Sequence, residues 1–190
     1  MKISDPPIID LAGFRLRPIE LDDIPMWYEY LRLPHVVEHT SWNLAAENDL
    51  DTVVSRFNST DVASPIRFVI EQTETRQFAG TIGFHNISIE SQTAEVGYDL
   101  HPDYWGRGIA TTTCKAVTGW ALRVHGLVQV QAITMETNEL STRVLRRCGF
   151  NFEKVLPSFR LVRGTQRDFL LFSRRVVPNA IPVAPVHLHL

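Results

Sequence analysis

The chain has 190 residues, enough for one domain with a sizeable hydrophobic core and short for two. Its 19 Lys and Arg residues against 21 Asp and Glu residues give a net charge of −2, which argues against the strongly basic surface of nucleic-acid-binding proteins and of polybasic membrane anchors. Hydrophobic residues make up 44% and charged residues 21% of the chain, so we expect a folded soluble domain with neither nucleic acid nor a membrane as partner.

The predicted secondary structure alternates strands with helices. Alternating apolar and polar residues indicate a strand at 14–19, whereas apolar residues at steps of three and four indicate a helix at 108–124. Gly126 and Gly149 follow two predicted helices and are expected to end them. The order of elements predicts an α/β (α+β) fold, a mixed central β-sheet of about six to seven strands with helices on both faces. The elements are strands at 14–19, 66–70, 78–85, 94–100, 128–135, 150–156 and 167–175, and helices at 24–31, 45–57, 108–124 and 139–148.

The domain is predicted to end before the last residues of the chain. No internal repeat or linker is visible, so residues 1–175 are predicted to form a single domain. Residues 176–190 carry no Asp, Glu, Lys or Arg and contain three prolines, so they cannot form a helix. This tail is either disordered or extended, and we predict that it docks on its own domain or on a neighbouring chain.

The first residues and the cysteines indicate a cytoplasmic protein. Residues 1–13 lack a basic segment followed by an apolar run, so no secretory signal is expected, and no apolar run is long enough to span a membrane. Cys114 and Cys148 occupy apolar positions of predicted helices, where a free thiol behaves as a small hydrophobic group. We expect buried reduced thiols, with a disulfide or a catalytic cysteine as the alternatives.

The segment Tyr104–Thr112 lies between a predicted strand and a predicted helix and has the features of an anion site. Its glycines let the backbone approach a ligand closely, and a helix start presents free N–H groups and a positive dipole end. Arg107 adds charge and two threonines add hydroxyl donors. No Gly-Lys-Ser/Thr follows, and no early βαβ unit precedes the loop, so neither nucleotide-binding motif applies. The loop is either a pyrophosphate site or a plain tight turn.

Two sequence motifs resemble those of one enzyme family. Residues 94–110, Ala-Glu-Val-Gly-Tyr-Asp-Leu-His-Pro-Asp-Tyr-Trp-Gly-Arg-Gly-Ile-Ala, closely resemble the core of GNAT-type N-acetyltransferases, and the RimJ/RimL-like branch is the nearest match. Asn138–Ser141 and Cys148–Phe150 resemble the helix start and the Gly-Phe ending of that branch. The resemblance spans about 14–172 and implies a GNAT fold and transfer of acetyl from acetyl-CoA to a primary amine.

The resemblance also implies a reaction and its alternative. The acceptor would be a protein N-terminal α-amine or a small-molecule amine, which attacks the thioester directly in a ternary complex. The alternative is a non-catalytic acyl-CoA-binding or assembly module with the same fold. Acetyl-CoA would be the co-substrate and the amine acceptor the partner, with a homodimer as a further option.

The resemblance assigns most of the acetyl-CoA contacts to backbone groups. In the family, N–H groups of the loop hold the pyrophosphate, and the preceding strand pairs with the pantetheine arm. Trp105 stands where the general family pattern has Gln or Arg, which removes one charged phosphate contact. The residues so implied are Arg107, Gly108, Ile109, Ala110, Thr111 and Thr112 for the pyrophosphate, Leu100 and Asn138 for the pantetheine arm, and Val96 and Tyr98 beside the thioester.

Two residues are candidates for proton transfer. Glu95 lies in an otherwise apolar strand and is the candidate base, acting directly or through water; the alternative is a salt bridge or a structural hydrogen bond. Ser141 is the candidate acid or hydrogen-bond donor for the leaving thiolate; the alternative is a first-turn hydroxyl that satisfies the backbone. Many family members use a Tyr further along this helix, and Leu145 occupies that position here.

The region after the first helix is where the family builds its acceptor pocket. Its aromatic and acidic residues would suit a cationic amine, although the first two are equally consistent with the core; they are Trp27, Tyr28, Glu38 and Trp42. His35 and His39 lie four residues apart with no third ligand at a suitable spacing, so no metal is expected. Arg143, Arg146 and Arg147 form either a solvated helix face or a contact to the CoA 3′-phosphate.

Overall fold

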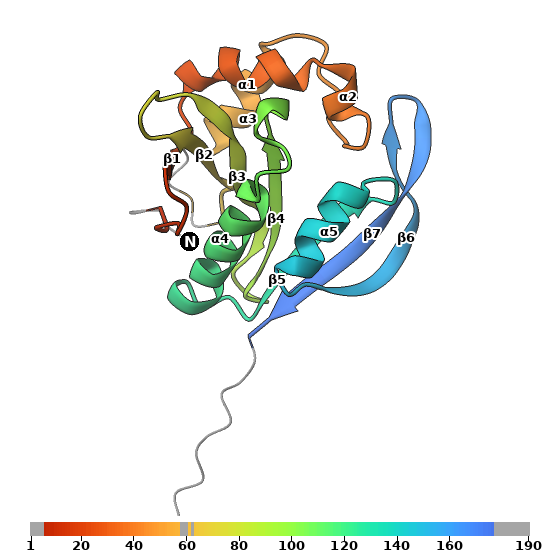
Figure 1. Ribbon diagram of the computed structural model, residues 1–190. Coiled ribbons are helices and arrows are strands. Elements are labelled where there is room, and N and C mark those ends of the chain that lie inside the picture. Colours follow the sequence, from red (N-terminus) through yellow and green to blue (C-terminus); the bar gives the residue numbers. More distant parts are fainter. Residues whose placement is uncertain (1–5, 58–60, 62, 177–190) are drawn as a thin grey trace, which may run out of the picture.

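The computed structural model describes residues 6–57, 61 and 63–176, and in them seven strands form one mixed sheet in the order β1-β2-β3-β4-β5-β7-β6 (Figure 1). The predicted sheet of about six to seven strands is therefore confirmed. The strands are β1 (Phe14–Pro18), β2 (Ile66–Gln72), β3 (Phe78–Ser88), β4 (Thr93–Leu100), β5 (Gln129–Met135), β6 (Asn151–Val162) and β7 (Thr165–Arg175). The helices are α1 (Ile24–Leu31), α2 (Pro34–Val37), α3 (Asp49–Phe57), α4 (Ile109–Val124) and α5 (Glu139–Arg147).

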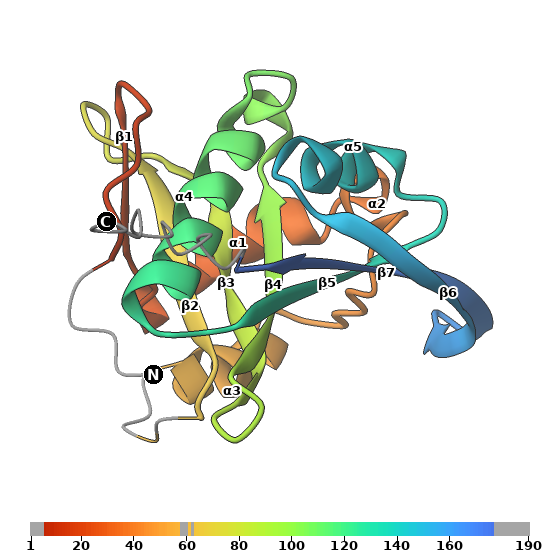
Figure 2. The same ribbon diagram turned by 90° about the horizontal axis from the view of Figure 1, so that it is seen from below.

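Helices cover both faces of the sheet, as predicted. α4 and α5 lie on one face and α3 on the other, while α1 and α2 cover one end (Figures 1 and 2). β2 shows why, because its side chains are apolar on both sides. Phe68 and Ile70 join the core cluster under α4 and α5, whereas Val69 joins the cluster formed by α1 and α3. Two large apolar clusters of the described residues therefore lie on opposite faces of the sheet, and Met135, Val162 and Phe169 form a smaller third one.

The sheet splits in the middle between β4 and β5. These parallel strands pair only at Thr93–Gln129, Ala94–Val130 and Glu95–Gln131. Beyond those pairs the ladder ends, and Figure 2 shows the two strands running in different directions. The edge of β4 from Val96 to Leu100 therefore lacks a partner strand on that side, while its other edge pairs with β3.

Two predicted elements have different bounds in the structure. The helix expected at 45–57 begins only at Asp49, because the Asp49 carboxylate accepts hydrogen bonds from Ala45 N at 2.7 Å and Ala46 N at 3.1 Å and fixes a turn there. The last two strands are longer than the predicted 150–156 and 167–175. Arg163 and Gly164 have φ of 46° and 79°, the consecutive left-handed pair of a tight hairpin turn, so pairing continues to that turn.

The other local predictions concern helix ends and cysteines. Gly149 has φ 81° after α5, which confirms its role as a left-handed cap. Cys114 and Cys148 are free and buried, as expected. In the part of the chain that the structure describes, no helix is both long and apolar enough to cross a membrane. The predicted docking of the tail concerns residues that, apart from Val176, lie outside the described ones.

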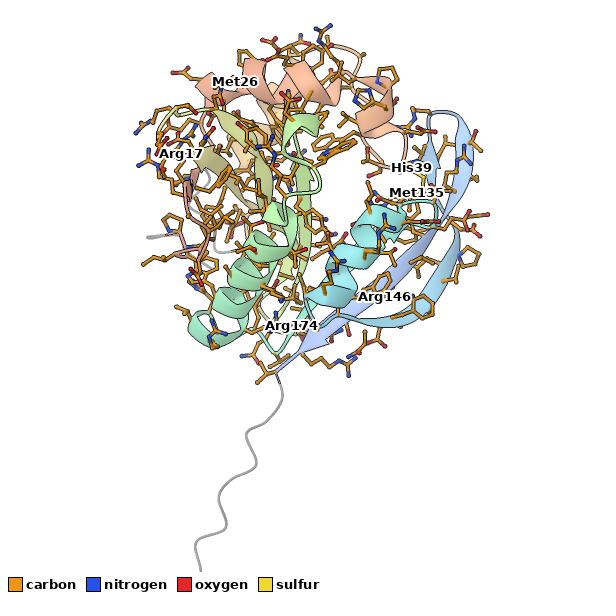
Figure 3. The ribbon with its side chains drawn as sticks, in the orientation of Figure 1. Arg17, Met26, His39, Met135, Arg146 and Arg174 are labelled. Carbon is orange, nitrogen blue, oxygen red and sulfur yellow. The ribbon has the colours of Figure 1, made fainter. Side chains whose placement is uncertain are left out.

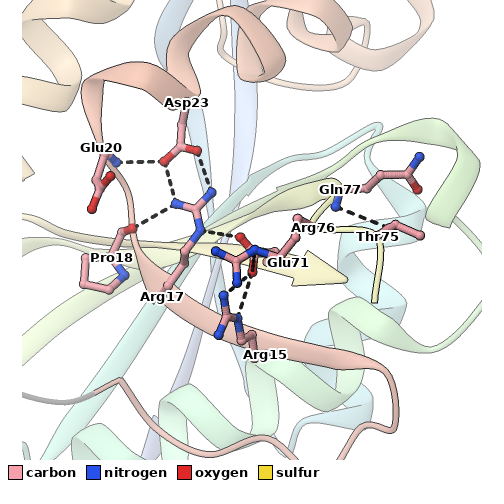
Figure 4. A network of polar contacts seen from close by, with 9 residues as sticks. All are labelled: Arg15, Arg17, Pro18, Glu20, Asp23, Glu71, Thr75, Arg76 and Gln77. Atoms are coloured by element: carbon pink, nitrogen blue, oxygen red, sulfur yellow. Dashed lines mark hydrogen bonds and ion pairs between the residues drawn. The ribbon is translucent and has the colours of Figure 1, made fainter. Parts of the chain in front are cut away.

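A buried carboxylate fixes the start of the chain to the sheet (Figure 4). Glu71 on β2 forms ion pairs with Arg15 at 2.6 Å and with Arg17 at 2.7 Å, both on β1. Arg17 also contacts Asp23 at 2.6 Å, directly before α1. Burial opposes the charge of Glu71, but hydrogen bonds from the two guanidinium groups outweigh it and lower the pKa of Glu71. This network sets the position of α1, which carries Trp27 toward the centre of the sheet.

Candidate active site

Two cavities meet at the split between β4 and β5. One of about 440 Å³ is lined by Glu95, His85 and Arg160, and we call it the Glu95 cavity. The other, of about 460 Å³, is lined by the segment before α4 and by α5, and we call it the Gly108 cavity. The residues that line both are His39, Thr40, Trp42, Tyr98, Asp99, Asn138 and Ser141.

The Gly108 cavity has the backbone geometry of an anion site. Gly106 and Gly108 have φ of 74° and 77°, in the left-handed region that favours glycine, and a Cβ on either would meet nothing within 4 Å. Gly108 is the N-cap of α4, so the first N–H groups of the helix have no partner within the helix and point to its open end. This arrangement can hold a phosphate without a side-chain cation.

Most of the residues predicted to hold the cofactor line the Gly108 cavity: Tyr98, Leu100, Trp105, Gly108, Ile109, Ala110, Thr111 and Asn138. Val96 lines the Glu95 cavity instead. Arg107 and Thr112 line neither cavity; Arg107 lies 5.4 Å from the Tyr104 ring centroid, and Thr112 N donates to Gly108 O at 3.0 Å. Trp105 Nε1 donates to Leu100 O at 2.9 Å, so the indole fixes the end of β4.

Tyr98 and Ser141 form a hydroxyl pair where the cavities meet. Their oxygens are 2.9 Å apart, and either can donate. Burial raises the pKa of Tyr98 well above its usual value, so its hydroxyl keeps its proton. Leu145, one turn further along α5, is buried in the core. The pair therefore provides O–H donors at the junction of the two cavities.

The loop between α2 and α3 is clamped to β5, α5 and the β6–β7 hairpin. Asn138 Oδ1 accepts from Ser141 N at 2.9 Å, and its Nδ2 donates to His39 O at 3.0 Å. Arg163 donates to Glu38 O at 3.0 Å and to Trp42 O at 2.7 Å. Figure 3 shows His39 beside Met135, at the end of β5. The loop therefore crosses the split in the sheet and forms a wall of both cavities.

Glu95 is a buried, fully engaged carboxylate in the Glu95 cavity. His85 Nε2 lies 3.0 Å from Glu95 Oε1, Asn86 Nδ2 donates to Oε2 at 3.0 Å, and Arg160 lies 4.0 Å from Oε1. Burial alone would raise its pKa, but hydrogen bonds from His85 and Asn86, with the charges of His85 and Arg160, outweigh burial and lower the pKa of Glu95. The carboxylate therefore stays charged and is a weak proton acceptor.

A second buried carboxylate, which the sequence reasoning missed, organises the same cavity. Asp99 lies two residues after Gly97 on the same face of β4 and pairs with Arg67 of β2 at 2.6 Å. It also accepts hydrogen bonds from Trp27 Nε1 at 3.0 Å, from the Tyr30 hydroxyl and from Thr81 Oγ1 at 2.9 Å. The period-two alternation of β4 could have placed Asp99 on the same face of the strand as Glu95, although it could not have identified the partners of Asp99.

The four predicted acceptor residues are placed differently. Trp27 and Trp42 line the Glu95 cavity and pack edge to face, with centroids 5.4 Å apart. Glu38 lines the Gly108 cavity, with its side chain exposed. Tyr28 packs against the core of α1 and α3 and lines neither cavity. His35 lies in α2 and His39 beyond its end at Val37, so the two do not share a helical face.

Among the described residues, no group of three or more His, Cys, Asp or Glu side chains is placed to hold a metal ion. The two cavities bring together the anion cradle before α4, the Tyr98–Ser141 hydroxyl pair and the buried carboxylates of Glu95 and Asp99. Residues 14–151 match the protein family described as "Acetyltransferase (GNAT) domain". The chain belongs to the GNAT acetyltransferase family.

Individual relatives of this GNAT chain agree with that assignment. It is 34% identical over 108 residues to the "Uncharacterized N-acetyltransferase YoaA" of Bacillus subtilis, covering 57% of this chain and 61% of that protein. It is 30% identical over 94 residues to the "Putative ribosomal N-acetyltransferase YdaF" of the same organism, covering 50% of this chain and 51% of that protein. These matches span less than two thirds of either relative. A relative named for ribosomal acetylation supports the RimJ/RimL-like branch.

Solved structures confirm the GNAT fold. The spermidine N-acetyltransferase of Vibrio cholerae, solved in complex with CoA and spermine, superposes on this chain with a TM-score of 0.77. The superposition covers 87% of this chain and 96% of that chain at 17% sequence identity. At that identity the likeness concerns the fold alone.

Proposed function

We propose that this protein is an acetyl-CoA-dependent N-acetyltransferase that transfers the acetyl group to a primary amine by direct attack in a ternary complex. The observation that carries the proposal is the meeting of the two cavities at Tyr98 and Ser141. A donor bound in the Gly108 cavity and an acceptor bound in the Glu95 cavity would face each other at the split in the sheet. Simultaneous binding of both substrates is what direct transfer requires.

The residues of the Gly108 cavity fit acetyl-CoA. The N-terminus of α4, from Gly108 to Thr111, would hold the pyrophosphate, and the unpaired edge of β4 from Val96 to Leu100 would pair with the pantetheine arm. When bound, acetyl-CoA supplies the reactive thioester. In this proposal it is held by Tyr98, Leu100, Trp105, Gly108, Ile109, Ala110, Thr111 and Asn138 of the Gly108 cavity, together with Val96 of the Glu95 cavity and with Arg107 and Thr112, which line neither.

The hydroxyl pair and Glu95 are the chain's candidate catalytic groups. Ser141 would protonate or hydrogen-bond the leaving sulfur, and the Tyr98 hydroxyl at 2.9 Å would orient Ser141. Glu95 would place negative charge on the acceptor side, where the amine arrives as an ammonium ion. Trp27 and Trp42 would form the aromatic wall beside it, with Tyr28 and Glu38 further away.

The charges of the Glu95 cavity favour an α-amine or a small amine over a polyamine. Both carboxylates that line it are already engaged, because Asp99 pairs with Arg67, Glu95 accepts hydrogen bonds from His85 and Asn86, and the positive charge of Arg160 lies 4.0 Å from Glu95. Such a cavity offers little free negative charge to a polycation. An α-amine has a pKa of about 7.7–8.0 against about 10.4 for a lysine amine, so more of it is neutral at physiological pH.

An acceptor panel tests this function. Purified protein is incubated with acetyl-CoA and one acceptor, either a peptide with a free N-terminal Ala or Ser, the same peptide with a blocked N-terminus, or spermidine. Release of CoA thiol and the mass of the product are measured. We expect turnover with the free peptide at least tenfold above spermidine. Tight acetyl-CoA binding without acceptor-dependent thiol would instead support the non-catalytic binding module.

We also propose a cytoplasmic location, supported by the two buried free thiols of Cys114 and Cys148, which fit a reducing compartment. The net charge of −2 supports an acceptor other than nucleic acid and a site away from membranes. A homodimer is the assembly we propose to test, with light scattering of the purified chain as the measurement.

A further inference from the structure

His85 is placed to act on a substrate in the Glu95 cavity. It lies on β3 directly opposite Glu95 on β4, so both side chains project to the same face of the sheet. Its Nε2 is 3.0 Å from Glu95 Oε1, and its side chain is 36% exposed where that of Glu95 is 8% exposed. His85 is therefore the partner of this pair that a substrate can reach.

The contacts of His85 and Glu95 determine which ring nitrogen of His85 can accept a proton. An irregularity in β3 after His85 gives Asn86 a φ of 50°, which brings Asn86 Nδ2 to 3.0 Å from Glu95 Oε2. With one carboxylate oxygen held by Asn86, the other accepts from Nε2 of His85. A proton on Nε2 leaves the lone pair on Nδ1, so Nδ1 is the atom that can accept a further proton.

The His85 imidazole lies over Gly97 of β4, where any residue other than glycine would bring its side chain close to the ring. A Cβ on Gly97 would lie 3.3 Å from Cε1 and 3.6 Å from Nδ1 of His85, and 3.4 Å from an Arg67 guanidinium nitrogen. Gly97 stands between Val96 and Tyr98, the residues proposed to flank the thioester. The absence of a side chain at Gly97 thus lets the imidazole approach the strand beside the reacting bond.

Glu95 is poorly suited to take the proton itself. Both of its oxygens are engaged, and its partners lower its pKa, whereas the acceptor ammonium has a pKa near 8 if it is an α-amine. Imidazole is the side chain most often used as a base near neutral pH, and a carboxylate on its far nitrogen fixes the tautomer and stabilises the imidazolium.

We propose that His85 Nδ1 is the general base that deprotonates the acceptor ammonium, and that Glu95 positions His85; this rests on the proposed function. One proton passes from the ammonium nitrogen to Nδ1, and the nitrogen lone pair attacks the thioester carbonyl carbon. The C–N bond forms, the C–S bond breaks, and its electron pair leaves on sulfur. The second proton of the former ammonium ends on that sulfur, through Ser141, to give the free thiol.

The pH dependence of this step is set by the groups around His85. Glu95 faces it from β4, Arg67 approaches it from β2 over Gly97, and Arg160 reaches the same carboxylate oxygen from β6. The charged and titratable side chains that line the cavity are His39, Arg56, Arg67, His85, Glu95, Tyr98, Asp99 and Arg160.

The test compares three variants of the full chain over pH 5.5 to 9.5 with saturating acetyl-CoA and the peptide acceptor of the panel. The variants are His85→Gln, Glu95→Gln and His125→Gln, the last a control on the end of α4 that lines neither cavity. For His85→Gln we expect kcat/KM to fall about 100-fold at pH 7. The pH profile of this variant should lack the acid limb of the wild type. Its kcat/KM should instead rise with pH up to the pKa of the acceptor amine. His125→Gln matches the wild type.

Glu95→Gln separates positioning from catalysis. We expect this variant to keep an acid limb in kcat/KM, which His85→Gln loses, while its kcat/KM falls because the imidazole is no longer held by a carboxylate. A His85→Gly variant provides a rescue test, because free imidazole added to it should raise its rate at least tenfold. Acetyl-CoA affinity, measured by calorimetry, should stay within about threefold of the wild type in all variants, which shows that they fold.

Two results overturn the proposal in different ways. If the wild type releases thiol with the peptide and His85→Gln keeps kcat/KM within threefold with the same acid limb, His85 is not the base and the acetyltransferase function stands. If the wild type binds acetyl-CoA but releases no thiol with any acceptor of the panel, the proposed function fails, and the role of His85 fails with it.

Discussion

Asp99→Asn should destabilise the fold strongly, because it removes the charge that compensates a buried guanidinium. The side chains of Arg67 and Asp99 are 9% and 8% exposed, and their nearest atoms are 2.6 Å apart. Breaking a buried ion pair by removing one partner typically costs about 3–5 kcal/mol, because the other charge stays buried without compensation. Asparagine keeps an oxygen acceptor for Trp27, Tyr30 and Thr81, so the loss comes mainly from the charge.

The free energy of unfolding is measured in urea, with tryptophan fluorescence and circular dichroism as the two probes of unfolding. For a chain of this size, about 3–5 kcal/mol corresponds to a fall in melting temperature of roughly 6–20 °C. Asp103→Asn is the matched control, because that side chain is 79% exposed, and it should stay within about 0.5 kcal/mol of the wild type.

A double variant tests the cause of the loss. Arg67→Met combined with Asp99→Asn removes the uncompensated cation, so it should be at least about 1 kcal/mol more stable than Asp99→Asn alone. The reasoning would be refuted by an Asp99→Asn variant within about 1 kcal/mol of the wild type. It would also be refuted if the double variant lost as much stability as the two single variants added together.

Three further predictions concern the cofactor loop, the hydroxyl pair and the network of Figure 4. Gly108→Glu should weaken acetyl-CoA binding at least tenfold in calorimetry, whereas Gly126→Glu, also at a left-handed glycine with open space around it, should not; equal affinities would contradict the pyrophosphate placement. Ser141→Ala should lower kcat about tenfold with little change in acetyl-CoA affinity, and an unchanged kcat would remove its assigned role. Because the pKa of Glu71 is lowered in the folded state, its stabilisation is present above about pH 4.5 and is lost as the pH falls through the folded value. Glu71→Gln should therefore cost about 2 kcal/mol near pH 7 and show a flatter acid unfolding curve, and a curve parallel to the wild type would contradict this.

The sequence predicted the elements whose signals are local. The helical spacing of apolar residues predicted α4, and the glycine after α5 predicted where that helix ends, both without reference to the rest of the chain. The predicted bounds of both helices were correct within one residue. The helix expected at 45–57 was too long, because the Asp49 side chain binds the two preceding N–H groups in competition with a helix. The final hairpin was too short, because the pattern ended before the turn at Arg163 and Gly164.

The contacts of the site were harder to predict. Glu95 was identified as a candidate base because a charge stands in an apolar strand, but its partners depend on the register of β3 against β4 and on the irregularity at Asn86. Asn138 was assigned to the cofactor, yet its side chain already caps α5 and holds His39 O, which lies 99 residues away in sequence. Contacts of this kind are set by tertiary packing and leave no local pattern.

The two cavities differ in how the sequence encodes them. An anion site made of backbone N–H groups uses consecutive residues, so the loop before α4 forms a motif that is visible in the sequence alone. The Glu95 cavity is lined by residues from the strands β2 to β7, from α1, α3 and α5 and from the loop before α3, and most of these segments contribute only a few residues. Substitutions there change the acceptor side without altering the motif. Proteins that share this motif should therefore differ most in the acceptor they acetylate.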